Sequence, residues 1–224
     1  ERTKPYEGLI YLNRGICYYY SDNRHMAEED FIKSIDIEPD NINPYINLAY
    51  IYIDTGRPQK AIEYLVKAEH RDDLAIILAL SEAYMGAGRI EEAFELLNKI
   101  PSDKKDEFIR AAFMKSDYYM SVNELQKAYD AVMDLMSVYP SELEIYRYLI
   151  RILIARENFT TALSMYDCLL QINPNDVSVL FQKGKLCAFL RNYKEAKIIY
   201  SRALKIDPEN REIKKALSSI SHLM

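Results

Sequence analysis

Two arginines, Arg147 and Arg151, stand four residues apart in a stretch that we expect to be helical. Residues at this spacing lie one turn apart on the same helix face. Guanidinium groups bind carboxylates through paired, charge-assisted hydrogen bonds, so the two arginines predict a site for acidic side chains. The alternative is that both arginines form ion pairs with acidic residues of the chain itself, Glu144 and Asp117.

Catalytic chemistry has no comparable support in the sequence. The chain contains neither a G-x-x-x-x-G-K-[ST] phosphate loop nor a G-x-S-x-G nucleophile motif. Asp and Glu are plentiful, but they are expected on helix surfaces, where no apolar pocket would tune a general acid or base. We therefore expect no enzyme activity and no cofactor for this segment.

Cysteine and histidine residues are few and scattered. Cys17, Cys168 and Cys187 have no close spacing and fall on apolar helix faces or beside them, which favours small buried side chains in a reducing compartment. No two histidines share a helix turn with each other or with a cysteine, so no metal site is expected. Because no apolar run is long enough to span a membrane and no signal peptide is visible, we expect a cytoplasmic protein.

The helices that must position these residues recur along the chain. In residues 192–210, Ala196, Tyr200 and Ala203 share one helix face, and Pro208 ends the helix. The same pattern returns five times, in part with weaker copies, at separations of 34, 32, 35, 34 and 34 residues. A fixed period of this length indicates a stacked repeat architecture. The anchoring alanines are Ala27, Ala61, Ala93, Ala128, Ala162 and Ala196.

A second helix is predicted upstream of each anchoring alanine. Its middle residue is small and has larger residues at spacings of four and three, as in Tyr11, Gly15 and Tyr18. Short breakers such as Thr55–Pro58 separate the two helices of a pair. The middle residues are Gly15, Ala49, Ser81, Ser116 and Gly184, with the larger Ile150 as the exception in the fifth copy.

This succession of helix, turn, helix and turn, with its small–large packing pairs, resembles the tetratricopeptide repeat. The resemblance covers residues 8–210 and implies an all-α fold, a right-handed α-solenoid of helix-turn-helix repeats. Residues 1–7 are an N-terminal flank, and residues 211–224 are predicted to form a capping helix that turns Ile213, Leu217 and Ile220 inward. The six predicted repeats are residues 8–41, 42–73, 74–108, 109–142, 143–176 and 177–210.

Two junctions between repeats depart from the pattern. The second repeat lacks its proline and closes at Arg71–Asp73, and the third breaks early, at Pro101. We expect a local change in superhelical pitch at these places. At the start of the array, we expect Leu9 and Ile10 to lie near an open end. The first residue is not Met and the last comes abruptly, which suggests a segment of a longer chain.

The resemblance also implies where a partner would bind. In tetratricopeptide arrays the first helix of each repeat lines a concave groove that holds extended peptides or helices. Residues 9–20 and 45–53 are apolar almost all round, so they present an apolar stripe to a partner unless tight curvature buries it internally. The predicted apolar groove residues are Leu9, Leu12, Ile16, Tyr19, Tyr20, Ile46, Tyr50, Ile53, Leu78, Met85 and Phe113. The predicted basic groove residues are Arg110, Arg147, Arg151 and Lys185.

Chaperone-binding members of this family hold the acidic tail of a chaperone in a carboxylate clamp. The clamp requires Lys and Asn at the positions where this sequence has Leu12 and Ile16, and only Asn47 fits its pattern. We therefore expect no clamp of this kind in the first three repeats. Arg147 and Arg151 are at most a variant of it.

The charge of the chain is uneven. Residues 1–108 have a net charge of −8, and residues 109–224 have a net charge of +3. An acidic array is a poor electrostatic partner for nucleic acid, so nucleic-acid binding is not expected.

The sequence thus predicts a non-enzymatic scaffold or adaptor that binds a peptide or helix of a partner protein in its groove. One alternative is a self-associating structural array, in which the apolar first repeat forms a homodimer. Another alternative is the substrate-recruiting arm of a larger enzyme. Because the function of such arrays depends on the chemistry of the groove, the repeat fold alone does not choose among these roles.

Overall fold

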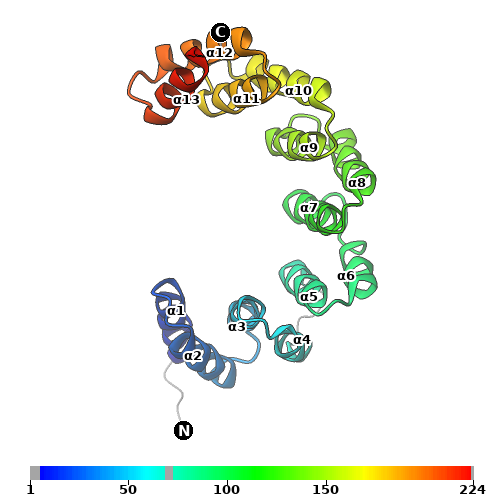
Figure 1. Cartoon of the computed structure of the whole chain (residues 1–224). Coiled ribbons are helices and arrows are strands. Elements are labelled where there is room, and N and C mark those ends of the chain that lie inside the picture. The colour runs from blue at the N-terminus through cyan, green and yellow to red at the C-terminus, as the bar shows by residue number, and fades with distance from the viewer. Residues whose placement is uncertain (1–5, 69–72, 223–224) are drawn as a thin grey trace. The chain divides into compact units, whose positions relative to one another are not determined.

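The structure, a computed structural model, describes residues 6–68 and 73–222. Within these two ranges it contains thirteen α-helices and no β-strand (Figure 1). The helices follow one another with short connections from one end of the described chain to the other. The predicted all-α helical repeat fold is therefore confirmed.

The chain divides into two compact units, and the division falls between Lys115 and Ser116. Helix α7 (Lys105–Ser121) runs across this division. The other helices of the first unit are α1 (Glu7–Tyr20), α2 (Arg24–Ile37), α3 (Ile42–Asp54), α4 (Pro58–Lys67), α5 (Leu74–Gly86) and α6 (Ile90–Leu97). Those of the second unit are α8 (Leu125–Val138), α9 (Leu143–Ala155), α10 (Phe159–Ile172), α11 (Val177–Phe189), α12 (Tyr193–Ile206) and α13 (Arg211–Ser221).

Local sequence signals explain where many of these helices begin. Several start directly after an Asn or Asp whose side chain accepts a hydrogen bond from a backbone amide of the first turn, which satisfies a donor that the helix itself leaves unpaired. Helix α4 instead starts with Pro58, whose fixed φ suits the first helical position. The capping residues are Asn23, Asn41, Asp73, Asn158, Asp176, Asn192 and Asn210.

The turns that join the two helices of each pair share one backbone feature. In each of them the residue two positions before the second helix has a positive φ, between 57° and 75°. Gly56 and Gly88 adopt this left-handed conformation without steric cost, whereas the other residues carry a Cβ that disfavours it. The six residues are Asp22, Gly56, Gly88, Asn123, Glu157 and Arg191.

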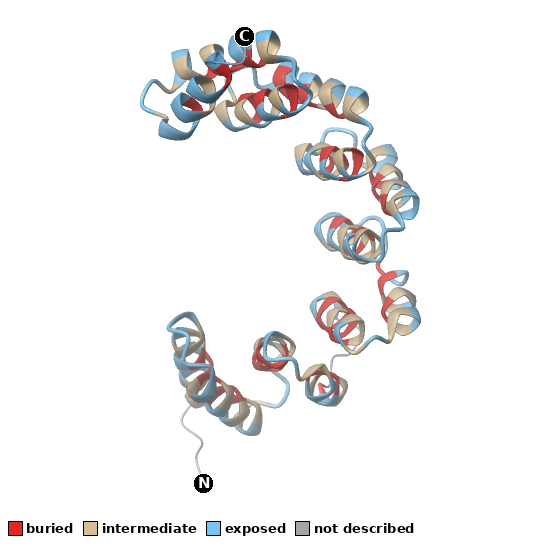
Figure 2. Ribbon diagram, viewed as in Figure 1, coloured by how far each residue is buried: buried red, intermediate tan, exposed pale blue. Residues whose placement is uncertain are grey.

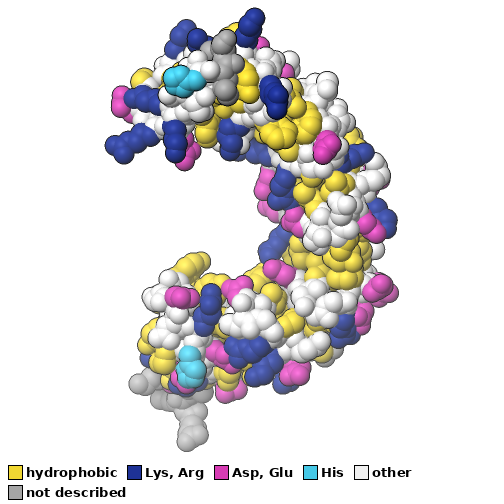
Figure 3. Space-filling view, in the orientation of Figure 1, with side chains coloured by type: hydrophobic (Ala, Val, Ile, Leu, Met, Phe, Trp, Pro, Cys, Tyr) yellow, Lys and Arg dark blue, Asp and Glu magenta, His cyan; other side chains and the backbone are white. Residues whose placement is uncertain are grey.

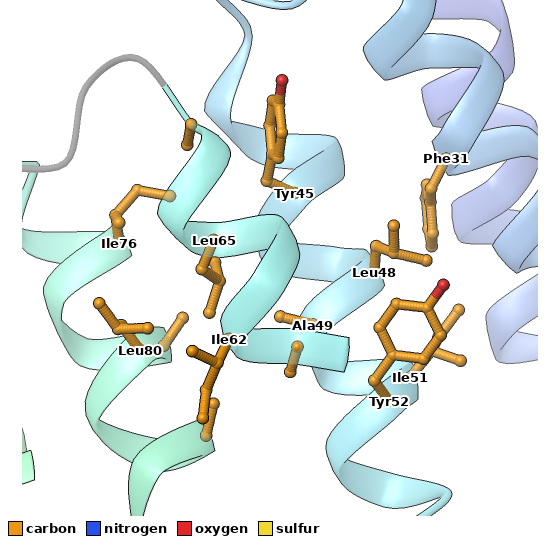
Figure 4. Close-up of a cluster of buried hydrophobic side chains, with 14 of the residues drawn as sticks. Phe31, Tyr45, Leu48, Ala49, Ile51, Tyr52, Ile62, Leu65, Ile76 and Leu80 are labelled. Atoms are coloured by element: carbon orange, nitrogen blue, oxygen red, sulfur yellow. The ribbon is translucent and has the colours of Figure 1, made fainter. Parts of the chain in front are cut away.

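The core of the first unit is built from side chains of successive helices. Helix α3 packs against α2, α4 and α5, and Figure 4 shows Phe31, Leu48, Leu65 and Ile76 converging from these four helices. A further cluster joins α5, α6 and α7. Because each helix buries its apolar face against its neighbours along the chain, the core continues from pair to pair through the unit.

The second unit is packed in the same way. Helix α9 contacts α8 and α10, and α11 contacts α10, α12 and α13. The final helix, α13, buries Ile213 and Ile220 against this core and leaves Lys214 and Lys215 in water. Its two faces therefore have the distribution expected of a helix that covers the end of a stack.

The small residues of the repeat pattern lie where helices approach each other. All six anchoring alanines are completely buried, and among the middle residues Gly15, Ala49, Ser81, Ser116 and Gly184 are buried as well. In Figure 2 the buried stretches follow one side of most helices, and the opposite side is exposed. The larger middle residue, Ile150, is also buried, so this helix accommodates an aliphatic side chain at the same place.

The structure differs from the predicted repeat boundaries at one junction. Helix α7 begins at Lys105, although the fourth repeat was expected to start at residue 109. Asp106 and Glu107 lie in the first turn of this helix, where acidic side chains favour its positive N-terminal end. The preceding α6 is short, with 8 residues. Of the other predicted junction, Arg71 and Asp72 lie outside the described residues, as do residues 1–5 of the N-terminal flank.

Candidate functional site

A cavity of about 310 Å³ lies in the second unit between α9, α10 and α11. Arg147 and Arg151 of α9 both line it, so the structure brings these two predicted residues to one site. Their side chains are 53% and 51% exposed, which places the charged groups at the water-facing rim. The rest of the lining is mostly apolar and comes from Ile150, Ile154, Tyr166, Leu169 and Val179, together with Ser178 and Gln182.

Arg147 forms an ion pair with Asp176, the residue that precedes α11. Its Nη2 atom donates a hydrogen bond to Oδ2 of Asp176 at 3.1 Å. The other carboxylate oxygen of Asp176, Oδ1, accepts a hydrogen bond from the backbone amide of Val179 at 3.0 Å and caps α11. The helix cap thus holds a carboxylate beside Arg147, and this carboxylate belongs to Asp176, whereas the alternative drawn from the sequence had named Glu144.

Arg151 forms its ion pair with Asp117 of α7, as the alternative interpretation of the sequence expected. Its guanidinium carbon also lies 4.1 Å from the centre of the Tyr148 ring, a geometry that favours a cation–π interaction. Burial, followed by hydrogen bonding to Asp117, raises the pKa of the Tyr148 hydroxyl, so this phenol stays protonated at neutral pH. Arg151 is therefore held from two sides.

The other two basic residues of the prediction do not line this cavity. Lys185 of α11 places its ammonium group 5.4 Å from the centre of the Phe181 ring. Arg110 belongs to the first unit, where it donates a hydrogen bond to the hydroxyl of Tyr50 at 2.7 Å and lies 3.8 Å from Glu82. Basic and acidic side chains are interspersed on the visible faces of both units in Figure 3. The positive charge of the cavity therefore comes from Arg147 and Arg151.

The predicted apolar surface of the first unit contains a row of polar contacts. The hydroxyl of Tyr19 in α1 donates to Oδ2 of Asp54 in α3 at 2.8 Å. The contacts of Arg110 with Tyr50 and Glu82 then join α7 to α3 and α5. Asp54 and Glu82 occupy groove positions of the family pattern, and this signal could have added them to the candidate residues.

The predicted apolar residues differ in how far they are exposed. Leu12 and Leu78 are only 5% and 3% exposed, so they belong to the core and not to the exposed surface where they were expected. Leu9 and Tyr20 are exposed. The remaining residues are partly exposed, namely Ile16, Tyr19, Ile46, Tyr50, Ile53, Met85 and Phe113.

The cysteines are free thiols in three different environments. Cys187 is buried and Cys168 is partly buried, but Cys17 is exposed, so the expectation of a buried side chain is wrong for Cys17. Burial raises the pKa of the Cys187 thiol and disfavours its reactive thiolate form. Across residues 6–68 and 73–222, no group of three or more His, Cys, Asp or Glu side chains is placed to hold a metal ion.

Within the two described ranges of the chain, no helix is both long enough and apolar enough to cross a bilayer.

Two features of the cavity were not anticipated from the sequence. The first is Asp176, whose position just before a helix is typical of an N-cap residue and could have identified it. The second is the contribution of Tyr166 and Leu169, because both lie on α10, the second helix of its pair, and not on a first helix. No pattern in the local sequence shows that side chains of α10 extend into the space between α9 and α11.

Comparison with known proteins agrees with this architecture. Sequence models of the tetratricopeptide repeat match residues 9–41, residues 31–63, and residues 55–116 together with 153–220. Human protein O-mannosyl-transferase TMTC1 is 22% identical over 220 residues, which cover 95% of this chain and 24% of that protein. The TPR repeat-containing protein MJ1428 of Methanocaldococcus jannaschii is 22% identical over 214 residues, which cover 88% of this chain and 37% of that protein. The chain thus spans about a quarter and just over a third of the length of these curated relatives.

Solved structures show the same fold. The C-terminal part of a TPR repeat-containing protein from Cytophaga hutchinsonii superimposes with a TM-score of 0.64 at 16% identity, covering 92% of this chain and 83% of that one. PilF of Pseudomonas aeruginosa superimposes with a TM-score of 0.62 at 15% identity, covering 95% of this chain and 97% of that one. Because the repeat models match more than half of the residues and the helical architecture agrees, the chain belongs to the tetratricopeptide repeat family.

Proposed function

We propose that this chain is a non-enzymatic adaptor that binds a segment of a partner protein, and that the cavity between α9, α10 and α11 receives part of that segment. Membership in the tetratricopeptide repeat family supports the general role of a protein-interaction scaffold. The observation that carries the more specific proposal is the presence of two arginine side chains at the rim of one apolar cavity.

The size and lining of the cavity suit a protein side chain. Its volume of about 310 Å³ lies at the lower end of the range of ligand pockets, which suffices for one large apolar side chain or two smaller ones. Ile150, Ile154 and Leu169 would exclude water around such a group. Arg147 and Arg151 would bind acidic groups beside it, since guanidinium groups are suited to carboxylates.

The first unit offers a surface of a different character. Its partly exposed Tyr50 and Ile53 lie on α3 near Asp54, so apolar area and hydrogen-bonding groups occur together. Tyrosine provides contact area and a hydroxyl that remains satisfied in water, which is typical of protein-binding surfaces. We propose that this surface contributes contacts of its own to a partner, independently of the cavity in the second unit.

The proposal is tested by affinity capture from a native extract followed by mass spectrometry. The wild-type chain is compared with the double variant Arg147→Glu/Arg151→Glu, and with Lys194→Glu/Lys197→Glu as a control. The control makes the same change in net charge at two exposed residues of α12 that do not line the cavity. We expect a distinct protein to be recovered by the wild type and the control, and to be depleted with the arginine variant.

Two results would contradict the proposal. If the partner bound the arginine variant with unchanged affinity and unchanged salt dependence, the cavity would not be the site of acidic recognition. If only the bait's own chain were recovered, self-association would replace the adaptor role. Measurement of the mass by light scattering at several concentrations would then test for a homodimer.

A second candidate function is supported by one of the comparisons. The match to human protein O-mannosyl-transferase TMTC1 covers 24% of that protein, so a repeat segment of this kind is similar to part of a protein named as an enzyme. In this alternative the chain would be the substrate-recruiting arm of a larger enzyme. The sequence of the full-length transcript tests it, because a catalytic domain encoded in the same reading frame is required.

A further inference from the structure

We propose that Asp117 and Asp176 act as internal substitutes for the partner's carboxylates, each holding one arginine of the cavity until an acidic partner segment replaces it. This inference rests on the proposed function of the cavity. It adds a mechanism that sets the affinity: the partner must compete with two carboxylates of the chain itself. The partner segment is accordingly an acidic peptide that carries an apolar side chain beside its carboxylates.

The ion pairs lie where a partner can exchange them. Arg147 and Arg151 are half exposed and Asp117 is 57% exposed, whereas Asp176 is only 20% exposed. Water therefore reaches both partners of the Arg151 pair, and it reaches the Arg147 pair from the arginine side. Exposed ion pairs contribute little to the stability of a folded protein, because water and salt screen them. Breaking the pair of Arg151 with Asp117 therefore costs little, and a new carboxylate can regain the interaction at either arginine.

Asp176 can release Arg147 without disturbing the helix that it caps. Its Oδ2 atom contacts Arg147, whereas its Oδ1 atom accepts the hydrogen bond from the amide of Val179 at 3.0 Å. The two interactions use different oxygens of one carboxylate. When a partner's carboxylate replaces Asp176 at Arg147, the N-terminus of α11 therefore stays in place.

Arg151 keeps its position when its ion pair with Asp117 is broken. The ring of Tyr148 lies 4.1 Å from the guanidinium carbon and, although its hydroxyl is also hydrogen-bonded to Asp117, it stands on the same helix as Arg151 and remains a second contact for the guanidinium group. Arg147 and Arg151 also stand one turn apart on a single rigid helix, α9. Both guanidinium groups are therefore oriented before the partner arrives, which lowers the entropic cost of binding.

The apolar lining completes the description of the ligand. A carboxylate alone would reach the arginines at the rim and leave the space between Ile150, Tyr166 and Leu169 unfilled. An apolar side chain next to the carboxylate would fill it and bury apolar surface. The site thus favours a segment in which acidic and apolar residues alternate or adjoin, in preference to a purely acidic one.

The test uses two substitutions that remove one charge each and change little else. Asp176→Asn retains an oxygen that can cap α11, since Asn is as good an N-cap as Asp. Asp117→Asn changes an exposed residue. Asp167→Asn is the matched control: Asp167 is an exposed carboxylate of the same unit, and it pairs with Lys183 outside the cavity. Circular dichroism melting of each variant verifies that it is folded.

The probe is a fluorescein-labelled peptide, Gly-Ser-Glu-Leu-Glu-Leu-Glu-Gly-Ser, and its affinity is measured by fluorescence anisotropy. We expect Asp117→Asn to tighten binding by about two- to five-fold, the range that an exposed ion pair contributes. Asp176→Asn should tighten binding at least as much, because the Asp176 carboxylate is only 20% exposed. Asp167→Asn should leave the affinity unchanged. A peptide with Gln in place of every Glu should not distinguish the variants from the wild type.

The possible outcomes separate the exchange mechanism from the proposed function. If the wild type binds the acidic peptide but neither Asp variant binds it more tightly than Asp167→Asn does, the exchange mechanism is wrong and the cavity remains a binding site. If Arg147→Glu/Arg151→Glu binds the peptide as well as the wild type, the cavity itself is not the site. If none of the proteins binds the peptide, both ideas are overturned.

Discussion

The ring of Tyr200 in α12 lies against Gly184 in α11 so closely that a Cβ atom on Gly184 would be 2.5 Å from the Cε1 atom of the ring. Gly15 in α1 has the same relationship to Phe31 in α2, with a distance of 2.7 Å from the built Cβ to the ring. Both rings are almost completely buried. In these two helix pairs the small middle residue therefore provides the space that the large residue of the second helix occupies.

Replacement of Gly184 by alanine should accordingly destabilise the protein. The added methyl group would displace the buried Tyr200 ring, and overpacking of this kind costs roughly 1–3 kcal/mol. Urea denaturation of Gly184→Ala measures the change in the free energy of unfolding. Gly86→Ala is the control: its new Cβ would be 3.4 Å from Pro58, an ordinary contact, so this variant should be as stable as the wild type or slightly more stable. Equal stability of the two variants would contradict the close packing of Gly184.

The anchoring alanines make a second prediction. Ala162 of α10 is completely buried, and Ala162→Leu would place three additional carbon atoms in a packed interface. We expect a loss of roughly 1–3 kcal/mol and a lower thermal midpoint in a circular dichroism melt. Ala155→Leu at the exposed end of α9 should leave the midpoint nearly unchanged. An unchanged midpoint for Ala162→Leu would show that the repeat register is wrong.

The residues with positive φ in the turns allow a test in which two substitutions should change the stability in opposite directions. Arg191 has φ 60°, a conformation that costs an L-residue roughly 1–2 kcal/mol, so Arg191→Gly should stabilise the protein by up to about 1 kcal/mol after the entropy of glycine is subtracted. Gly56 has φ 69° with no atom near its built Cβ, so Gly56→Ala should destabilise through the backbone alone. The two thermal midpoints should move in opposite directions. A fall in the midpoint of Arg191→Gly would contradict this account.

Glu82 predicts a pH dependence of stability. Burial raises the pKa of its carboxyl above the ordinary value of 4.5, and this effect exceeds the opposing effect of Arg110. Because the folded state binds the proton more tightly than the unfolded state, the contribution of Glu82 is fully present below pH 4.5 and is lost as the pH rises through the folded pKa. The free energy of unfolding of Glu82→Gln minus that of the wild type should therefore increase as the pH rises across this window.

The measurement for Glu82 is a series of urea denaturation curves between about pH 4 and pH 8. Glu63→Gln, at an exposed carboxylate of α4, is the matched control for the loss of one negative charge. If the free energy of unfolding of Glu82→Gln minus that of the wild type stays constant or falls as the pH rises, Glu82 is not held in a desolvated environment.

The fold could be predicted because its signals are local and repeated. Alanine at a period of about 34 residues, Asn or Asp before a helix, and breakers in each turn are visible without knowledge of any contact. The start of α7 was less predictable, since its extra turn follows the short α6 and has no counterpart in the other repeats. A periodic pattern is sufficient to place the repeats, but it does not predict a helix that starts outside the period.

The candidate site could be predicted only in part. The spacing of Arg147 and Arg151 was sufficient to place them on one face, because both belong to one helix. The family pattern also offered Leu12 and Leu78 as partner contacts, but neighbouring helices bury both. Exposure depends on how closely the adjacent helix approaches, and a pattern of residue types does not contain that distance.

The helical period, the all-α class and the pair of arginines are properties of short segments, so the order of the amino acids was enough to establish them. The ion pair of Arg147 with Asp176, that of Arg151 with Asp117, and the cavity walls from α10 join residues that are distant in the chain. Such contacts depend on how whole helices pack against one another. The packing of α7, α9, α10 and α11 therefore decided which charges meet and where an apolar side chain can enter.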